Sequence, residues 1–430
     1  MKIHLIGIGG IGVSALAQYY LSKGHQVSGS DLERSEITDF LKQKGVKIFI
    51  KHKAVNIEKD LDLVVYSPAV KLSNPEIKKA KQFKIKTQTY PEALGDLTKE
   101  YYTIAVAGSH GKSTTTTMIG LVLTAAGLDP TVIVGTKVRE FGGSNFREGK
   151  SKLLVIEACE YDSSFLHYSP KIIVITNVDK EHLDYFKTFN RVKKEFQKFM
   201  MKLSSDGFLV VNKDDKNIPI FEQSKFNVQN YSLNQSEADK IKNILKIPGQ
   251  HNVSNALAVL TVARILAIPD KIIFKSISDF KGSWRRFEIK KGIIDRKKIT
   301  IISDYAHHPN EIIATLKAAR DKFPKEKILC VFQPHQHQRT YYLFKDFIKI
   351  FREAPVDKII LTDIYDVAGR ETKKISLKIN SKKLIKEIKK ESVIYCATNS
   401  LEKTIKENIT SGDVLIIMGA GDIYKFAEKF

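Results

Sequence analysis

Residues 103–117 read TIAVAGSHGKSTTTT, and this stretch decides the fold. A buried-strand pattern runs into a glycine turn, and a helical pattern follows until Gly127, which is expected to end the helix. The turn contains Gly111, Lys112 and Ser113 as a GK[ST] motif. In such a turn backbone amides hold phosphates, the lysine reaches the β and γ phosphates, and the serine coordinates Mg²⁺. The stretch therefore predicts a nucleotide-binding α/β domain.

The literal P-loop pattern fails at one position. It requires a glycine five residues before Gly111, where the chain has Val106. Because GK[ST] still lies between a strand and a helix, we interpret the turn as a shortened P-loop with the same mechanics. The phosphate contacts are expected from the turn and the first helical residues, namely Gly108, Ser109, His110, Gly111, Lys112, Ser113 and Thr114.

Two further buried strands are predicted downstream, over 153–158 and 171–178, and acidic side chains follow them. Glu157 closes the first strand and is expected to face the phosphate loop and complete a Mg²⁺ shell, with Glu160 as the alternate ligand. The second strand leads into Asn177, Glu181, His182 and Asp184, which predicts a further metal ligand at the same sheet edge. The alternatives are a solvated acid pair and a structural histidine.

A second glycine turn lies near the beginning of the chain. Gly7, Gly9 and Gly12 form GxGxxG after a strand and before a helical stretch over 14–22, and Asp31 ends the next strand. This context predicts that amides at a helix N-terminus hold a diphosphate. The pattern does not distinguish NAD from a UDP-sugar, and a tight turn without a ligand is the third interpretation.

The last part of the chain returns to βα alternation after a stretch over 281–288, KGSWRRFE, which we interpret as a linker. Arg285 and Arg286 in that stretch are expected either to contact ATP phosphates or to be surface arginines. Four of the eleven histidines fall at two predicted strand ends, in DYAHHP at 304–309 and QPHQHQR at 333–339. Substrate-binding groups are favoured there over a zinc site, because no Cys or Glu spacing completes one.

Length and composition bound the possible classes. At about 100 to 200 residues per domain, 430 residues predict two to four domains, and ordinary hydrophobic and charged fractions exclude a disordered or collagenous chain. No membrane span or signal peptide is expected, which favours a cytoplasmic protein. Cys159, Cys330 and Cys396 are too few and too scattered for a disulfide framework. The net charge of +22 suits anionic ligands, with nucleic acid or a merely lysine-rich surface as alternatives.

Taken in order, the motifs resemble the Mur ligases, the ATP-dependent amino-acid ligases of peptidoglycan synthesis. The resemblance covers essentially the whole chain and is carried by nine segments: GIGGIGVSALA with SGSD, AVAGSHGKSTTT, EACEYDSSFL, ITNVDKEHLDYF, PGQHNVSNALA, WRRFE, DYAHHPNEIIATLKAAR, FQPHQHQRT and GAGDIYKFA. It implies an α/β fold with three domains. The expected domains are a Rossmann-like domain at 1–99, a P-loop ATPase-like domain at 100–282 and a Rossmann-like domain at 283–430.

The resemblance also implies ligands and roles. UDP-N-acetylmuramate is expected in the first domain, ATP and Mg²⁺ in the second, and the amino acid partly in the third. The resemblance therefore favours a UDP-sugar over NAD as the ligand of the first glycine turn. Phosphate transfer is assigned to Lys112, Glu157, His182 and Arg286, and the metal to Ser113, Glu157 and His182. Further nucleotide contacts are assigned to Asn252, Asn255 and Asp304. Substrate contacts are assigned to Gly9, Gly10, Ile11, Gly12, Ser30, Asp31, His308 and Arg339.

Four positions depart from the family pattern. Cys159 and Glu181 stand where aspartates are usual, and Ser113 replaces a frequent threonine. More consequential is Gln336, which stands where an arginine is usual, because glutamine cannot form a bidentate charged pair with an amino-acid carboxylate. Some relatives carry a carboxylated lysine near the metal, and no motif selects one from Lys193, Lys194 and Lys198.

The reaction that the resemblance implies joins L-alanine to the lactyl carboxylate of UDP-N-acetylmuramate through an acyl phosphate, with ADP and phosphate as products. The expected partners are these small molecules, without nucleic acid or membrane insertion, for a monomer or weak homodimer. Three rivals remain: a murein tripeptide ligase acting on the same UDP-sugar, a nucleic-acid-binding ATPase, and an NAD-dependent oxidoreductase.

Overall fold

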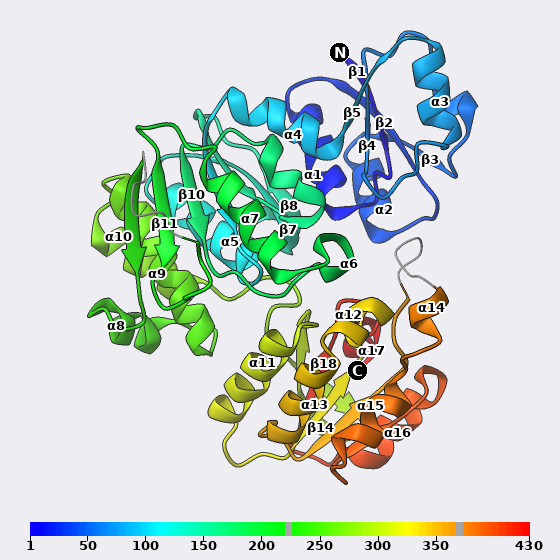
Figure 1. The fold of residues 1–430 in the computed structure, drawn as a ribbon, viewed down its shortest axis with the longest axis vertical. Helices are drawn as coiled ribbons and strands as arrows, with labels where there is room; N and C mark the ends of the chain where they lie inside the picture. The colour runs from blue at the N-terminus through cyan, green and yellow to red at the C-terminus, as the bar shows by residue number, and fades with distance from the viewer. Residues whose placement is uncertain (220–225, 367–372) are drawn as a thin grey trace. The chain divides into compact units, whose positions relative to one another are not determined.

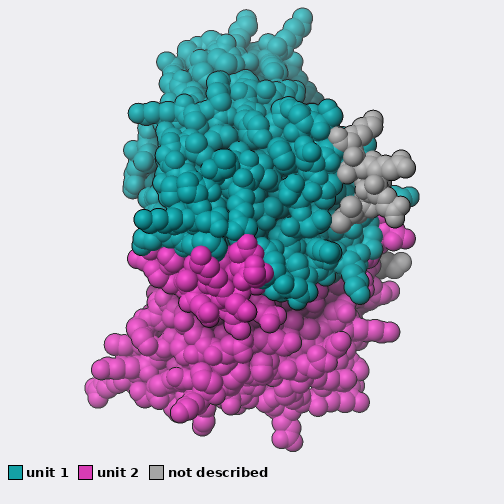
Figure 2. Space-filling view, turned by 90° about the vertical axis from the view of Figure 1, so that its left-hand side faces the viewer, with its two compact units in different colours: residues 1–179, 193–235, 255–277 teal, residues 180–192, 236–254, 278–430 magenta. Residues whose placement is uncertain are grey.

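The structure, a computed structural model, describes residues 1–219, 226–366 and 373–430. Helices and strands alternate along the described chain, as predicted for an α/β protein (Figure 1). The chain forms two compact units, coloured separately in Figure 2. The first unit comprises residues 1–179, 193–235 and 255–277, and the second comprises 180–192, 236–254 and 278–430.

The first unit begins with a five-stranded parallel sheet in the order β3-β2-β1-β4-β5. This is a Rossmann-type order, in which ligands bind beyond the carboxyl ends of the strands where the order reverses. The strands are β1 (Lys2–Ile6), β2 (Gln26–Asp31), β3 (Lys47–Ile50), β4 (Leu63–Tyr66) and β5 (Lys86–Thr89). The accompanying helices are α1 (Ile11–Ser22), α2 (Glu36–Gln43), α3 (Pro75–Gln82) and α4 (Tyr90–Lys99).

A second sheet of the first unit has seven strands in the order β12-β11-β10-β6-β9-β7-β8, parallel except for the β7–β8 pair. Its strands are β6 (Tyr102–Ala107), β7 (Thr131–Val138), β8 (Ser144–Arg147), β9 (Leu153–Glu157), β10 (Ile172–Ile175), β11 (Phe208–Asn212) and β12 (Asn227–Tyr231). The helices in this part of the chain are α5 (Lys112–Ala125), α6 (Leu183–Phe186), α7 (Phe189–Met200), α8 (Glu237–Ile244), α9 (Gln250–Ile265) and α10 (Asp270–Asp279).

Several local predictions are confirmed here. The strands expected over 153–158 and 171–178 are β9 and β10, and the helix after the glycine turn is α5. Gly127 follows the last turn of α5 with a φ of +76°, the left-handed conformation that favours glycine. The β7–β8 hairpin was not predicted, although Gly142 and Gly143 between its strands are a turn signal.

Buried amides join the two sheets of the first unit. Gln18 on α1 donates from Nε2 to Asn145 Oδ1 at 2.8 Å and accepts at Oε1 from Ser144 Oγ at 2.8 Å. Asn145 Nδ2 in turn donates to Ile11 O and to Ser14 Oγ. Because buried polar groups cost free energy when they lose their partners, these contacts fix α1 against β8.

The second unit is built on a six-stranded sheet in the order β13-β14-β18-β15-β16-β17. The strands are β13 (Glu288–Ile294), β14 (Lys297–Asp304), β15 (Ile328–Phe332), β16 (Lys358–Leu361), β17 (Val393–Tyr395) and β18 (Val414–Met418). The helices are α11 (Pro309–Lys322), α12 (His337–Tyr342), α13 (Phe344–Glu353), α14 (Lys373–Ser376), α15 (Ser381–Ile388), α16 (Leu401–Asn408) and α17 (Tyr424–Lys429).

Both faces of this third sheet are buried. Ile302, Cys330 and Ile416 lie in one apolar cluster, and their strand neighbours Ile301 and Leu415 lie in another. Strands covered on both faces are typical of a parallel α/β sheet. The predicted linker over 281–288 is one residue too long, because Glu288 begins β13, which pairs antiparallel with β14.

The three sheets follow one another along the sequence, with β1–β5, β6–β12 and β13–β18 in order. The domain boundaries predicted at 99/100 and 282/283 remain a prediction. Among the helices of the described ranges, none is long and apolar enough to cross a bilayer.

Candidate active site

The glycine turn between β6 and α5 adopts backbone angles that only glycine takes readily. Gly108 has a φ of +138° and Gly111 a φ of +82°. A Cβ atom at Gly108 would collide with Thr176 Oγ1. The helix begins at Lys112, so amides at an α-helix N-terminus face the turn, which suits phosphate binding.

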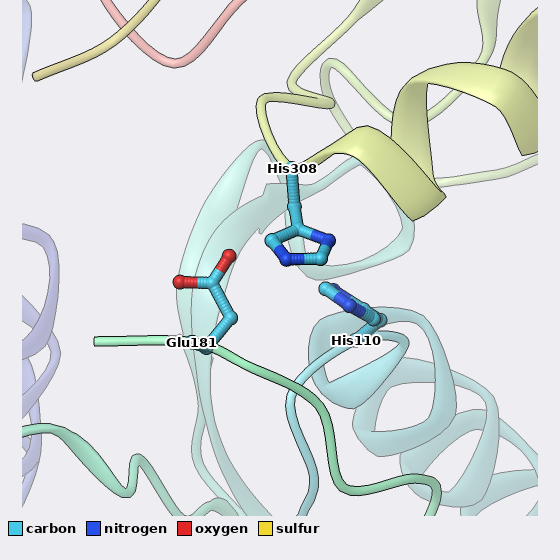
Figure 3. Close-up of side chains that lie close together, drawn as sticks. All are labelled: His110, Glu181 and His308. Atoms are coloured by element: carbon cyan, nitrogen blue, oxygen red, sulfur yellow. The ribbon is translucent and has the colours of Figure 1, made fainter. Parts of the chain in front are cut away.

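Residues after β10 brace this turn. His110 N donates to Asn177 Oδ1 at 2.8 Å, while Asn177 Nδ2 donates to His110 O at 3.0 Å. Asp179 N donates to Ser109 Oγ at 2.8 Å, and the Asp179 carboxylate lies 3.0 Å from His110 Nε2. Figure 3 shows His110 on the segment that leads into α5. Asn177 therefore positions the phosphate loop, and a metal beside it remains a prediction.

Lys112 is held inside the loop by a buried carboxylate. Its Nζ donates to Gly108 O and to Ser109 O, and it pairs with Glu160 Oε2 at 3.0 Å. Burial disfavours the ammonium, yet Glu160 together with Cys159 and Glu157 outweighs burial and raises the pKa of Lys112 above its ordinary value. Glu160, the alternate metal ligand, is 1% exposed and acts as the counter-ion of Lys112.

Ser113 and Glu157 form the predicted metal pair. Ser113 Oγ donates to Glu157 Oε2 at 2.8 Å, and Gly135 N donates to the same oxygen at 2.8 Å. A Cβ at Gly135 would lie 2.8 Å from Glu157 Oε2, so the absence of a side chain leaves room for the carboxylate. A hydroxyl and a carboxylate are oxygen ligands of the kind Mg²⁺ prefers, so the donor set fits that ion.

The two asparagines that are expected to contact the nucleotide belong to different compact units. Asn255 belongs to the first, where its side chain lies against Gly111 so closely that a Cβ on that glycine would collide with it. Asn252 belongs to the second, and its Nδ2 donates to Pro248 O at 2.6 Å. Asn255 therefore shapes the phosphate loop, and the adenine contact of both residues remains a prediction.

The first glycine turn is ordered by Asp31. Gly9 N donates to Asp31 Oδ2 at 2.8 Å, and Leu32 N donates to Oδ1 at 2.7 Å, so both carboxylate oxygens hold backbone. Gly12 lies under the ring of Tyr90, whose Cζ would be 2.8 Å from a Cβ at that position. The backbone N-terminal to α1 thus has the predicted shape, and ligand contacts by Gly9, Gly10, Ile11, Gly12 and Asp31 remain a prediction.

Ser30 has an internal role that the sequence did not indicate. Its side chain is fully buried, and its hydroxyl donates to Glu76 Oε2 at 2.5 Å and contacts His52 Nδ1 at 2.8 Å. Glu76 also accepts from Asn56 Nδ2 and from Lys53 N. Burial opposes ionisation of Glu76, but His4, 3.7 Å away, and hydrogen bonds from Ser30 and Asn56 lower its pKa below the ordinary 4.5.

Replacing Glu76 with glutamine is expected to lower the free energy of unfolding by about 2 kcal/mol at pH 7, because buried donors lose a charged acceptor. A lowered folded-state pKa gives stability that is present above the unfolded pKa and lost as the pH falls. The wild type should therefore lose stability below pH 4.5, and the variant should lose less. Urea unfolding at pH 7 and at a pH below 4.5 measures the free energy of unfolding of both proteins, and Glu33→Gln at an exposed position is the control. Equal losses of stability on acidification in the wild type and in Glu76→Gln would contradict the prediction.

In the second unit, Asp304 organises the segment that carries the two arginines. Its Oδ2 accepts from Phe287 N at 2.8 Å and its Oδ1 from Ala306 N at 2.7 Å, and burial raises its pKa to about 6. Arg285 is 5% exposed, lies over the rings of Trp284, Tyr305 and Tyr424, and donates to Gly419 O and Gly421 O. The interpretation of Arg285 as a surface arginine is therefore wrong, because it is buried and structural, and its contact with ATP phosphates remains a prediction.

Arg286 is half-buried over Tyr305, with its guanidinium carbon 5.0 Å from the ring centre. Its contact with nucleotide phosphates, like that of Asp304, remains a prediction. His182 and Asp184 also belong to the second unit, so the role of His182 as a metal ligand with Glu157 remains a prediction.

The histidines and Arg339 gather on the second unit. His308 is the N-cap of α11, where its Nδ1 accepts from Asn310 N at 3.3 Å, and Glu311 completes the capping box. Figure 3 shows Glu181 and His308 pointing toward one another. Arg339 Nη2 pairs with Glu181 Oε2 at 3.2 Å. His308 and Arg339, predicted near the amino acid, thus share this cluster with Glu181.

Sequence reasoning missed the supporting residues. Glu160 was considered only as a metal ligand, and Gly135 and Tyr90 carried no local signal, since each contacts a residue more than twenty positions away. Cys159 is a protonated thiol at neutral pH, because burial and then the charge of Glu160 raise its pKa to about 12.

Comparison with known proteins agrees with this architecture along the whole chain. Three family models match in order: Mur ligase family, catalytic domain, at 2–102; Mur ligase middle domain, at 106–263; and Mur ligase, glutamate ligase domain, at 285–421.

Curated relatives named UDP-N-acetylmuramate–L-alanine ligase are similar over the full length. The one from Clostridium botulinum is 42% identical and the one from Aquifex aeolicus 41%, each covering 100% of this chain and 97% of the relative. The crystal structure of a UDP-N-acetylmuramate–alanine ligase from Thermotoga maritima matches with a TM-score of 0.81 at 30% identity, covering 100% of this chain and 98% of that one. The chain belongs to the Mur ligase family.

Proposed function

We propose that this chain is a UDP-N-acetylmuramate–L-alanine ligase, which makes a peptidoglycan precursor in an ATP-dependent reaction. The observation that carries the proposal is the similarity of 41–42% over the full length to curated relatives of that name. The sequence predictions of family, three-part α/β fold and reaction agree with these comparisons.

ATP and Mg²⁺ are assigned to the second sheet. The loop from Gly108 to Ser113 suits the phosphates, since it combines helix N-terminal amides with a buried ammonium. Ser113 and Glu157 would hold Mg²⁺, which when bound offsets negative charge on the transferred phosphoryl group. His182, Arg286 and Asp304 are proposed to complete the nucleotide site.

The chemistry requires activation of a carboxylate, because a carboxylate and an amine do not condense usefully in water. The lactyl carboxylate of UDP-N-acetylmuramate attacks the γ-phosphorus of ATP, which gives an acyl phosphate and ADP. The amine of L-alanine then displaces phosphate and forms the amide. Lys112 is proposed to stabilise charge on the phosphoryl oxygens, and its ion pair with Glu160 supports this role because it fixes the ammonium before the reaction.

The acceptor site departs from the usual family pattern at one position. Gln336, which replaces the usual arginine, is 4% exposed and lies in a strained conformation with a φ of +71°. His308 and Arg339 are proposed to bind the amino acid. A monomer or weak homodimer in the cytoplasm, without nucleic acid, completes the proposal.

Phosphate release with UDP-N-acetylmuramate, ATP and a panel of acceptors tests this function. We expect L-alanine to support turnover in preference to other amino acids and to the murein tripeptide. Preference for the tripeptide would favour the murein tripeptide ligase. Stimulation by nucleic acid without UDP-N-acetylmuramate would instead indicate a nucleic-acid-dependent ATPase.

A further inference from the structure

Ser30 connects the first glycine turn to a buried carboxylate. Its backbone oxygen accepts from Gly7 N at 2.8 Å and from Ile8 N at 3.0 Å, so the residue holds the start of the turn. Its hydroxyl lies 2.5 Å from Glu76 Oε2 and 2.8 Å from His52 Nδ1. These three side chains form a chain of contacts from the interior to the carboxyl edge of the first sheet, where Rossmann-type sheets bind ligands.

The direction of each hydrogen bond in this chain follows from the carboxylate. Burial opposes the charge of Glu76, but the donors around it lower its pKa, so it is a carboxylate at neutral pH. A carboxylate only accepts, and the Ser30 hydroxyl therefore donates to it. Since a hydroxyl has one hydrogen, Ser30 Oγ accepts from His52, and Nδ1 carries a proton. In the neutral imidazole the other nitrogen, Nε2, is then an acceptor.

The second oxygen of Glu76 holds the loop that carries His52. Oε1 accepts from Asn56 Nδ2 at 2.5 Å and from Lys53 N at 3.2 Å. Asn56 Nδ2 also donates to Lys51 O at 3.1 Å, so the loop is fixed on both sides of His52. Because the carboxylate is fully buried, the loss of any of these contacts leaves a polar group without its partner.

The other ring nitrogen of His52 is left for a ligand. Among the residues that the structure describes, Nε2 has no hydrogen-bond partner, and the side chain is 10% exposed. We propose that Glu76 is a positioning residue for the nucleotide sugar, because through Ser30 it fixes the His52 tautomer in which Nε2 accepts a hydrogen bond from a hydroxyl or N–H of the ligand's uridine. The proposal rests on the proposed ligase function and deepens its first substrate site.

Glu76→Gln is expected to reverse the hydrogen bonds of this chain. The backbone N–H of Lys53 still needs an acceptor, so the glutamine oxygen takes the place of Oε1 and its NH₂ group faces Ser30. The hydroxyl then accepts from this group and donates to His52 Nδ1, which moves the imidazole proton to Nε2. Nitrogen-15 NMR shifts of labelled histidine, recorded at about pH 8 where an ordinary imidazole is neutral, distinguish the two tautomers. Loss of the signal in His52→Ala assigns it.

The same variant is expected to weaken the binding of UDP-N-acetylmuramate by about tenfold, because Nε2 would present a hydrogen to a donor of the ligand. Calorimetry measures this dissociation constant directly. In the steady state the KM for UDP-N-acetylmuramate should rise, while kcat and the KM values for ATP and L-alanine change by less than about twofold. In a His52→Ala background Glu76→Gln should add little, because both changes remove one contact.

Asp62→Asn is the matched control. It removes a carboxylate that accepts from a backbone N–H, that of Lys2 at 2.7 Å, but at the amino edge of the same sheet. The control should leave the His52 signal and the affinity for UDP-N-acetylmuramate unchanged. If Glu76→Gln does not fold, Ser30→Ala is measured in its place, since it breaks the same chain and should both release the His52 tautomer and weaken binding.

Three results would overturn the proposal. A wild-type His52 with its proton on Nε2 would contradict the direction of the chain. Unchanged affinity in a variant whose tautomer has changed would show that Nε2 receives nothing from the ligand. Effects of Glu76→Gln and His52→Ala that add in full would show that Glu76 does not act through His52. Failure of the ligase function is a separate outcome, since the wild type would then not bind UDP-N-acetylmuramate, whereas its NMR signal would still report the tautomer.

Discussion

Lys112→Ala is expected to reduce phosphate release from ATP, UDP-N-acetylmuramate and L-alanine by about a thousandfold or more, because the variant loses the fixed cation in the phosphate loop. The ammonium is anchored by Ser109 O and Glu160. Its removal also leaves the Glu160 carboxylate buried without its counter-ion, and that negative charge would repel the phosphates of ATP.

The binding of UDP-N-acetylmuramate to Lys112→Ala, measured by calorimetry, should stay close to wild type because its proposed turn lies on the first sheet. Lys99→Ala is the control, since Lys99 is exposed and pairs with Asp96 in its own helix. Wild-type turnover by Lys112→Ala would refute the assignment of ATP to this loop.

Glu157→Gln is expected to lower turnover by about a hundredfold or more and to raise the Mg²⁺ concentration that gives half-maximal activity. In the wild type, Ser113 Oγ and Gly135 N both donate to Glu157 Oε2. The glutamine side chain has nearly the same shape as that of Glu157, and its oxygen can still accept these hydrogen bonds. The variant therefore tests the charge of the ligand rather than the integrity of the loop.

A Mg²⁺ titration of the steady-state rate measures this effect. Glu157→Asp, which keeps the charge at a shorter reach, should restore part of the Mg²⁺ affinity. If both variants require the same Mg²⁺ concentration as the wild type, Glu157 is not a ligand of the ion, and its role is limited to holding the backbone of Gly135.

The sequence predicted those parts of the structure whose signals are local. GKS before a helix and GxGxxG after a strand each specify a turn within a few residues, and both turns form as predicted. The strands over 153–158 and 171–178 were predictable because buried parallel strands are continuous apolar runs.

Residues whose roles depend on distant partners were not predictable. Arg285 and Arg286 are adjacent in WRRFE, yet one is buried among aromatic rings and the other is half-buried. The substrate contact of Ser30 remains a prediction, but no local pattern indicated that its hydroxyl donates to Glu76, 46 positions away. Such pairings depend on how the helices pack, which no local pattern records.

The amide contacts of Gln18 with Ser144 and Asn145 have a thermodynamic consequence. Both glycine turns belong to sheets joined through this side chain, so the two sheets are expected to unfold as one cooperative element. A ligand at the turn before α1 would then slow hydrogen exchange in β8 as well, because the free energy of binding is shared by every residue that unfolds with the site. Binding of the nucleotide sugar to the first sheet is therefore expected to stabilise the second sheet, which carries the phosphate loop.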